Sequence, residues 1–98
     1  MTDLSLVVED TAVTSRRHRD AALAHTFRSG ELVWLVDEQY VAEGPTWRVT
    51  LIRQGPQGRW MRQRQRYDIP SQVLYFVGEQ PISDADLATA RQMGRRLS

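Results

Sequence analysis

Residues 46–66, "TWRVTLIRQGPQGRWMRQRQR", contain two alternating runs with a turn signal between them, and this stretch decides the fold. In the first run apolar side chains alternate with polar ones, and in the second run arginine alternates with glutamine. A period of two is typical of a strand whose two sides meet different surroundings. The glycines and proline of "QGPQG" predict a hairpin between the runs.

The length of the loop sets the register of this hairpin. A five-residue loop over residues 54–58 places Arg53 opposite Arg59 and Arg48 opposite Arg64. An even loop would mix valine with arginine on one face, because a one-residue shift sends every side chain to the opposite face. We therefore predict one largely apolar face and one basic face. The first carries Trp47, Val49, Leu51, Met61, Gln63 and Gln65, and the second carries Thr46, Arg48, Thr50, Ile52, Trp60, Arg62, Arg64 and Arg66.

Outside this hairpin the chain shows further strand and helix signals. Residues 31–36 and 72–77 are rich in β-branched and aromatic side chains, as are the predicted strands 46–53 and 59–69. Residues 4–8 are interpreted as a short strand or an extended arm. An alanine-rich helix follows, with Leu23 and Phe27 four residues apart and Gly30 as its stop signal. We expect it to begin near Asp20, because arginines 16, 17 and 19 would be unfavourable at the positive end of the helix dipole.

Near the C-terminus, Ser83 precedes Asp86 by three positions, which is close to a capping box and predicts a second helix over residues 82–97. Together the elements indicate an α+β fold, a small bent antiparallel barrel of four to five strands with an N-terminal and a C-terminal helix. We expect one domain over residues 1–98. It divides into an arm and helix (1–29), the barrel (30–78) and the C-terminal helix (82–97).

The entry into the strands, "FRSGELVWLV", has Phe27, Gly30 and Trp34 at the spacing found in Src-homology-3-like small barrels. Residues 27–77 resemble such a barrel, although Glu31 stands where those barrels often have aspartate. The resemblance implies the barrel fold and says little about function, because this fold hosts many unrelated activities.

The composition excludes several classes of chemistry. The chain has no cysteine, so disulfides, thiolate metal sites and cysteine nucleophiles are ruled out, and we expect a reducing, cytoplasmic location. No apolar run approaches the roughly 20 residues that span a bilayer, so we expect no membrane partner. His18 and His25 lie seven residues apart, too far along one helix to share a metal ion. We expect no cofactor and no enzymatic activity.

Charge is unevenly distributed along the chain. All 13 basic residues are arginine and the net charge is +1. The six charged residues between Gly44 and Asp68 are all arginines, which leaves the rest of the chain at −5, with seven basic and 12 acidic residues. Like charges opposite one another destabilise a sheet by about 0.2–1 kcal/mol, so a compensating charge is expected. It comes either from an external anion or from internal acids, for which the candidates are Asp20, Asp37, Glu38, Glu43 and Asp68.

The external alternative makes the basic face a ligand-binding site. Guanidinium groups bind phosphates in a bidentate manner, and a tryptophan beside them offers a stacking surface for an unpaired base. Residues 15–19, "SRRHR", either add a second basic patch on the same side or form an exposed helix start. The predicted ligand-binding residues are Arg48, Trp60, Arg62, Arg64 and Arg66.

The strands "LVWLV" and "VLYFV" are apolar on both faces and need cover on both sides. The two helices supply it through Leu23, Phe27, Leu87, Ala90, Met93 and Leu97, or else Trp34, Tyr75 and Phe76 form an interface in a homodimer. We therefore predict a non-catalytic binding module for an anionic partner, with nucleic acid as the first candidate. A protein-interaction or homo-oligomeric accessory protein, with an acidic protein partner, is the alternative.

Overall fold

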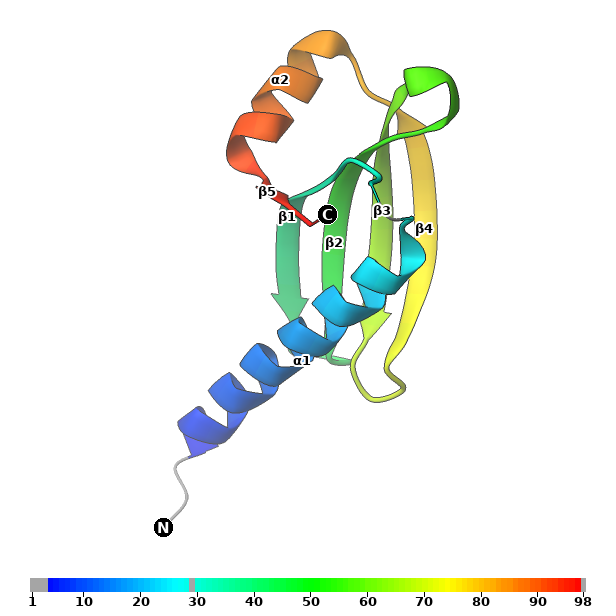
Figure 1. The fold of residues 1–98 in the computed structure, drawn as a ribbon. Coiled ribbons are helices and arrows are strands. Elements are labelled where there is room, and N and C mark those ends of the chain that lie inside the picture. Colours follow the sequence, from blue (N-terminus) through cyan, green and yellow to red (C-terminus); the bar gives the residue numbers. More distant parts are fainter. Residues whose placement is uncertain (1–3, 29, 98) are drawn as a thin grey trace.

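The fold is an open five-stranded antiparallel sheet with one helix across one face and a second helix at one end (Figure 1). The structure, a computed structural model, describes residues 4–28 and 30–97, with side chains from residue 12 onward. The strands lie in the order β4-β3-β2-β1-β5, and each neighbouring pair is antiparallel. The elements are α1 (Leu4–Thr26), β1 (Val33–Val41), β2 (Thr46–Gln54), a 3-10 turn (Pro56–Gly58), β3 (Trp60–Asp68), β4 (Val73–Pro81), α2 (Asp84–Met93) and β5 (Arg95–Arg96).

Helix α1 is longer than its sequence suggested. The predicted strand or arm at residues 4–8 is wrong, and so is a helix start near Asp20, because the backbone is helical from Leu4 onward. The basic run at residues 16–19 therefore lies in the body of the helix, away from the positive end of the dipole. Ser15, Arg19 and Leu23 recur at four-residue intervals, which puts them on one side of a helix. All three are buried, so this is the side that α1 turns toward the sheet.

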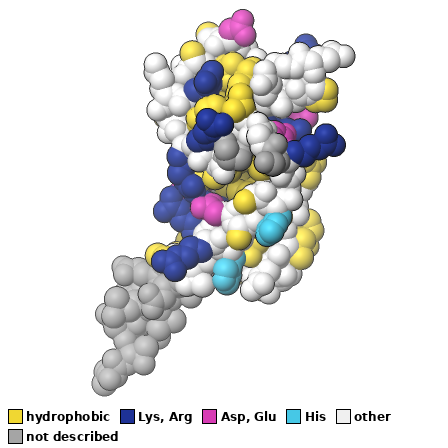
Figure 2. All heavy atoms as spheres, viewed as in Figure 1, with side chains coloured by type: hydrophobic (Ala, Val, Ile, Leu, Met, Phe, Trp, Pro, Cys, Tyr) yellow, Lys and Arg dark blue, Asp and Glu magenta, His cyan; other side chains and the backbone are white. Residues whose placement is uncertain are grey.

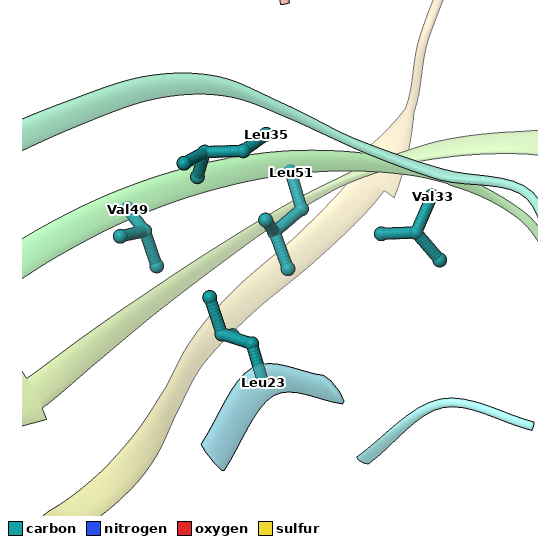
Figure 3. Packing of buried hydrophobic residues seen from close by; sticks show 5 residues of the cluster. All are labelled: Leu23, Val33, Leu35, Val49 and Leu51. Atoms are coloured by element: carbon teal, nitrogen blue, oxygen red, sulfur yellow. The ribbon is translucent and has the colours of Figure 1, made fainter. Parts of the chain in front are cut away.

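The hydrophobic core lies between α1 and the sheet. Leu23 is wholly buried and points from α1 onto Leu51 and Val49 of β2, with Val33 and Leu35 of β1 beside them (Figure 3). Truncating a buried leucine to alanine typically costs about 2–5 kcal/mol, so this contact holds α1 in place. Partly buried apolar side chains pack around the cluster, namely Phe27, Leu74 and Leu97. The predicted cover of the sheet by Leu23 and Phe27 is thus confirmed.

The two faces of the central hairpin separate as predicted, but its register differs. Arg48 lies opposite Arg66, not Arg64, and Gln54 lies opposite Trp60. The loop occupies residues 55–59 and is closed by a 2.7 Å hydrogen bond from the Gly55 N–H to the Arg59 carbonyl oxygen. The pairing is therefore shifted by two residues from the prediction. A shift of two keeps every side chain on its predicted face, since the period of a strand is two.

The sheet does not close into a barrel over the residues that the structure describes. Strand β4 pairs only with β3, and on the far side β5 pairs only with Trp34 and Leu35 of β1. The expected barrel would have buried its inner face by curling around it. Here α1 covers that face, so nine-residue strands can remain an open sheet. The α+β class, the strand number and the two helices agree with the prediction.

Helix α2 begins as predicted and ends sooner. The Ser83 hydroxyl accepts a 3.2 Å hydrogen bond from the Asp86 N–H, so Ser83 is the N-cap. The helix stops at Met93, and Gly94 leads into β5. A side chain on Gly94 would meet the Leu35 carbonyl oxygen at 2.8 Å, so only glycine lets the chain approach β1 this closely. Neither described helix is long and apolar enough to cross a bilayer.

Candidate anion-binding face

Four arginines on the neighbouring strands β2 and β3 define the candidate site, which we call the arginine face. They share the side of the sheet opposite α1, because they alternate with the core residues of the same strands. Successive arginines on β3 stand two residues apart, roughly 6.4–6.8 Å along the strand. The members of the arginine face are Arg48, Arg62, Arg64 and Arg66.

Three members of this face lack a carboxylate partner. Of the four arginines, Arg62 alone forms an ion pair with a described carboxylate, that of Asp86 of α2 at 4.0 Å. No described carboxylate oxygen lies within 4 Å of Arg48, Arg64 or Arg66. Arg66 instead lies over the Tyr75 ring, 5.0 Å from its centroid. The part of the face around Arg48, Arg64 and Arg66 therefore presents guanidinium groups that form no ion pair with a described carboxylate.

A hollow of about 510 Å³ lies over this part of the sheet. Arg48, Arg64 and Arg66 line it, and Gln39 and Thr50 add neutral hydrogen-bonding groups to its wall. One carboxylate, from Asp37, also faces it. Three cations against one anion leave the hollow positively charged, and it has donors suited to oxygen-rich anions.

Trp60 and Arg62 lie toward the other end of the face, under α2. The Trp60 and Trp34 rings are 5.6 Å apart at a 54° tilt. Arg91 of α2 lies 4.8 Å from the Trp34 centroid and 5.5 Å from that of Trp60. Six residues of strand, roughly 20 Å, separate Trp60 from Arg66. The structure thus brings Arg48, Arg64 and Arg66 together and places Trp60 in a separate aromatic and cationic stack.

The acids expected to neutralise the arginine face act mostly elsewhere. Asp20 and Glu38 lie on the α1 side, where Arg19 bridges them at 2.7 and 2.6 Å. Arg16 contacts Glu38 at 2.5 Å, and Arg95 contacts Asp20 at 2.9 Å. Burial alone would raise the pKa of Asp20, but hydrogen bonds from Arg19 and Arg95 outweigh it, so the pKa lies below its usual value. This network belongs to the packing of α1 and β5 against β1.

Asp68, at the end of β3, is held by its own turn. The Ser71 hydroxyl and backbone N–H both donate to its carboxylate, and these hydrogen bonds lower its pKa, with a smaller contribution from Arg66. Glu43 is exposed in the β1–β2 turn. Of the five candidate acids, only Asp37 lines the hollow.

Arg19 is an important residue that sequence reasoning missed. It has no exposed surface, and its guanidinium lies 4.8 Å from the Trp47 centroid. The Trp47 indole N–H donates to the Ser15 hydroxyl at 2.8 Å. The prediction that residues 15–19 add a second basic patch beside the arginine face is therefore wrong, because α1 carries this segment on the opposite side of the sheet. The four-residue spacing of Ser15, Arg19 and Leu23 was the sequence signal that could have placed Arg19 on the buried side of the helix.

The predicted interface residues do not form one surface. Trp34 belongs to the stack under α2, where Arg96 also lies 5.5 Å from its centroid. Tyr75 lies opposite Arg66 and so on the arginine side, whereas Phe76 lies opposite Gln65 on the α1 side. Both β4 aromatics are exposed. Figure 2 shows that hydrophobic side chains also reach the surface between α2 and the β2–β3 loop, with arginines beside them.

The chain has no match among protein-family models, curated proteins or solved structures. The resemblance of residues 27–77 to Src-homology-3-like barrels therefore stays a prediction. His18 and His25 are exposed on α1 (Figure 2). No group of three or more histidine, aspartate or glutamate side chains in the described part of the chain is placed to hold a metal ion.

Proposed function

We propose that this protein is a non-catalytic binding module that holds a nucleic acid on its arginine face. One observation carries the proposal: Arg48, Arg64 and Arg66 line a common hollow and have no carboxylate partner among the described side chains. The net charge of +1 is no obstacle. Asp20 and Glu38, with the cations that pair with them, lie on the other side of the sheet.

A row of guanidinium groups suits a polymer of phosphates. Each guanidinium can bind phosphate oxygens through two parallel N–H groups. Arg62, Arg64 and Arg66 repeat along an extended strand, so successive phosphates can lie against successive arginines. Gln39 and Thr50 offer further hydrogen bonds to phosphate or sugar oxygens.

An aromatic ring in contact with one arginine of this hollow favours a single strand over a duplex. Tyr75 is 43% exposed and already stacks with Arg66, so a flat base can lie against the same ring. Stacking of this kind is worth about 1–3 kcal/mol per base and requires unpaired bases. Trp60 was the predicted stacking residue, and its contacts with Trp34 and Arg91 leave Tyr75 as the better placed ring.

The test is a fluorescence anisotropy titration of labelled single-stranded and duplex oligonucleotides at low ionic strength. Saturable binding is expected, tighter for the single strand, and weaker for Arg64→Gln. Arg17→Gln is the matched control, since Arg17 is an exposed arginine on α1, away from the arginine face. Absence of saturable binding, or equal losses in both variants, would overturn the proposal. Binding of polyglutamate in place of oligonucleotides would indicate an acidic protein partner instead.

A further inference from the structure

Strand β4 leaves one edge of the sheet uncovered. Within residues 4–28 and 30–97, its only hydrogen-bonded neighbouring strand is β3. We define the β4 edge as residues 73–77, of which Leu74 is partly buried against the core. Figure 2 shows hydrophobic side chains on the side of the molecule where β4 runs. The other four side chains are exposed: Val73 by 42%, Tyr75 by 43%, Phe76 by 63% and Val77 by 63%.

The opposite edge of the sheet is protected, which makes the β4 edge exceptional. There, β5 pairs with the first part of β1, and the acids Asp37 and Glu38 with a bulge follow directly. Charges, bulges and short covering strands are the features that keep edges from pairing with other chains. On β4 the bulge comes only at the Gly78–Phe76 step, and Glu79 and Pro81 lie beyond it. Residues 73–76 thus form a regular apolar edge with none of these features.

We propose that the β4 edge pairs antiparallel with the β4 edge of a second copy of this chain, joining two sheets into one. Residues 73–77 contain no charged side chain, so self-pairing sets no like charges opposite one another. Pairing centred on Tyr75 places Leu74 of one copy against Phe76 of the other. Both lie on the α1 side, so the faces match across the seam.

The regular part of this edge is short and can pair along its whole length with an identical strand, which favours a second copy over a foreign strand. The bulge at Val77 ends the regular alternation, so a longer strand gains no matched pairs beyond it. An antiparallel pair of identical strands is also closed by a two-fold axis, which ends assembly at the dimer. At the rim of the seam, Arg66 lies over Tyr75, and tyrosine, phenylalanine and arginine are the residue types enriched in interfaces.

Pairing would also enlarge the arginine face, a consequence that rests on the proposed function. The two copies of Arg66 would be three strand spacings apart, roughly 14–15 Å, on one continuous surface. A nucleic acid strand could then cross both arginine faces, and one strand would bind per dimer.

The test is sedimentation equilibrium over a concentration series with Phe76→Lys and a matched control. The wild type is expected to approach twice the 11.3 kDa mass of one chain, and Phe76→Lys to remain at the single mass. Met93→Lys adds the same charge at an exposed apolar residue of α2, where Met93 is 76% exposed, and is expected to dimerise like the wild type. Circular dichroism verifies that both variants fold.

A wild type of single mass at every concentration would overturn the proposal, as would a dimer that persists in Phe76→Lys. Hydrogen exchange supplies a second measurement: the amides of residues 73–76 should be slowed in concentrated wild-type protein relative to dilute protein. Equal exchange at both concentrations would place any dimer seam elsewhere. Oligonucleotide binding by the monomeric variant is measured separately, so failure of the dimer is distinguishable from failure of the proposed function.

Discussion

Replacing Arg64 with glutamine should strengthen the fold while weakening anion binding. Arg62 and Arg66 stand two residues away on the same strand, and Arg48 lies diagonally across on β2. At roughly 7 Å in water, each like-charge pair costs about 0.6 kcal/mol. The Asp37 carboxylate in the same hollow offsets part of the total, and the long side chains splay apart. We therefore expect a gain of about 1 kcal/mol in the free energy of unfolding, equivalent to about 4–8 °C in Tm.

Salt gives this prediction a second signature. At 10 mM salt the screening length is about 30 Å and the repulsion is nearly intact, whereas at 1 M it is about 3 Å. Thermal unfolding followed by circular dichroism should show the Tm gain of Arg64→Gln at 10 mM salt and its disappearance at 1 M. Arg17→Gln should change Tm little at either concentration. If Arg64→Gln instead lowered the free energy of unfolding by more than about 1 kcal/mol at low salt, the arginine would be paired inside the protein and the reasoning would fail.

The packing of α1 and β5 yields three further predictions. Arg19→Ala should lower the free energy of unfolding by about 3–5 kcal/mol in urea denaturation, because it leaves Asp20 and Glu38 short of a buried partner. Folding lowers the pKa of Asp20, so its carboxylate stabilises the fold above pH 3.8, and this stabilisation is lost as the pH falls through the lowered pKa of the folded protein. Acid titration of the free energy of unfolding should show this loss in the wild type and a smaller loss in Arg19→Ala. Gly94→Ala should lower Tm by several degrees through its clash with the Leu35 carbonyl oxygen, whereas Gly78→Ala, with open space around it, should be nearly neutral by the same assay.

The separation of the two hairpin faces was predictable because one face is apolar and the other basic. Alternation fixes which side of a strand a residue occupies, and it cannot distinguish registers that differ by two residues. The choice between Arg64 and Arg66 as the partner of Arg48 depends on where the loop closes. That is decided by the Gly55 to Arg59 hydrogen bond and by the left-handed backbone of Gln57 and Gly58, at φ 64° and 75°.

The start of α1 and the role of Arg19 could not be obtained from local signals. The apolar run at residues 4–8 suits a strand as well as a helix, and periodicity does not separate the two over so short a length. Arg19 is buried because Glu38 and Trp47 of the sheet lie against it, 19 and 28 residues away in sequence. Partners this distant are set by the tertiary fold.

Cover for the apolar strands was predicted in part. Leu23 and Phe27 of α1 protect one face as expected. Helix α2 contributes less than expected, since it has no buried residue and Met93 is largely exposed. The length of α2 explains the difference: a helix of ten residues is about 15 Å long and covers only one end of strands that are nine residues long. The β4 edge is exposed for a different reason, because no further strand of the described residues pairs with it.

The salt dependence of oligonucleotide affinity tests the central claim most directly. The logarithm of the association constant should fall linearly with the logarithm of salt concentration, with a slope of about 0.7 per phosphate contact for a single strand. In the double variant Arg48→Gln with Arg64→Gln, the account predicts a slope shallower by about 1.4, with Arg17→Gln unchanged. An unaltered slope in the double variant would show that phosphates do not lie on the arginine face and would contradict the account.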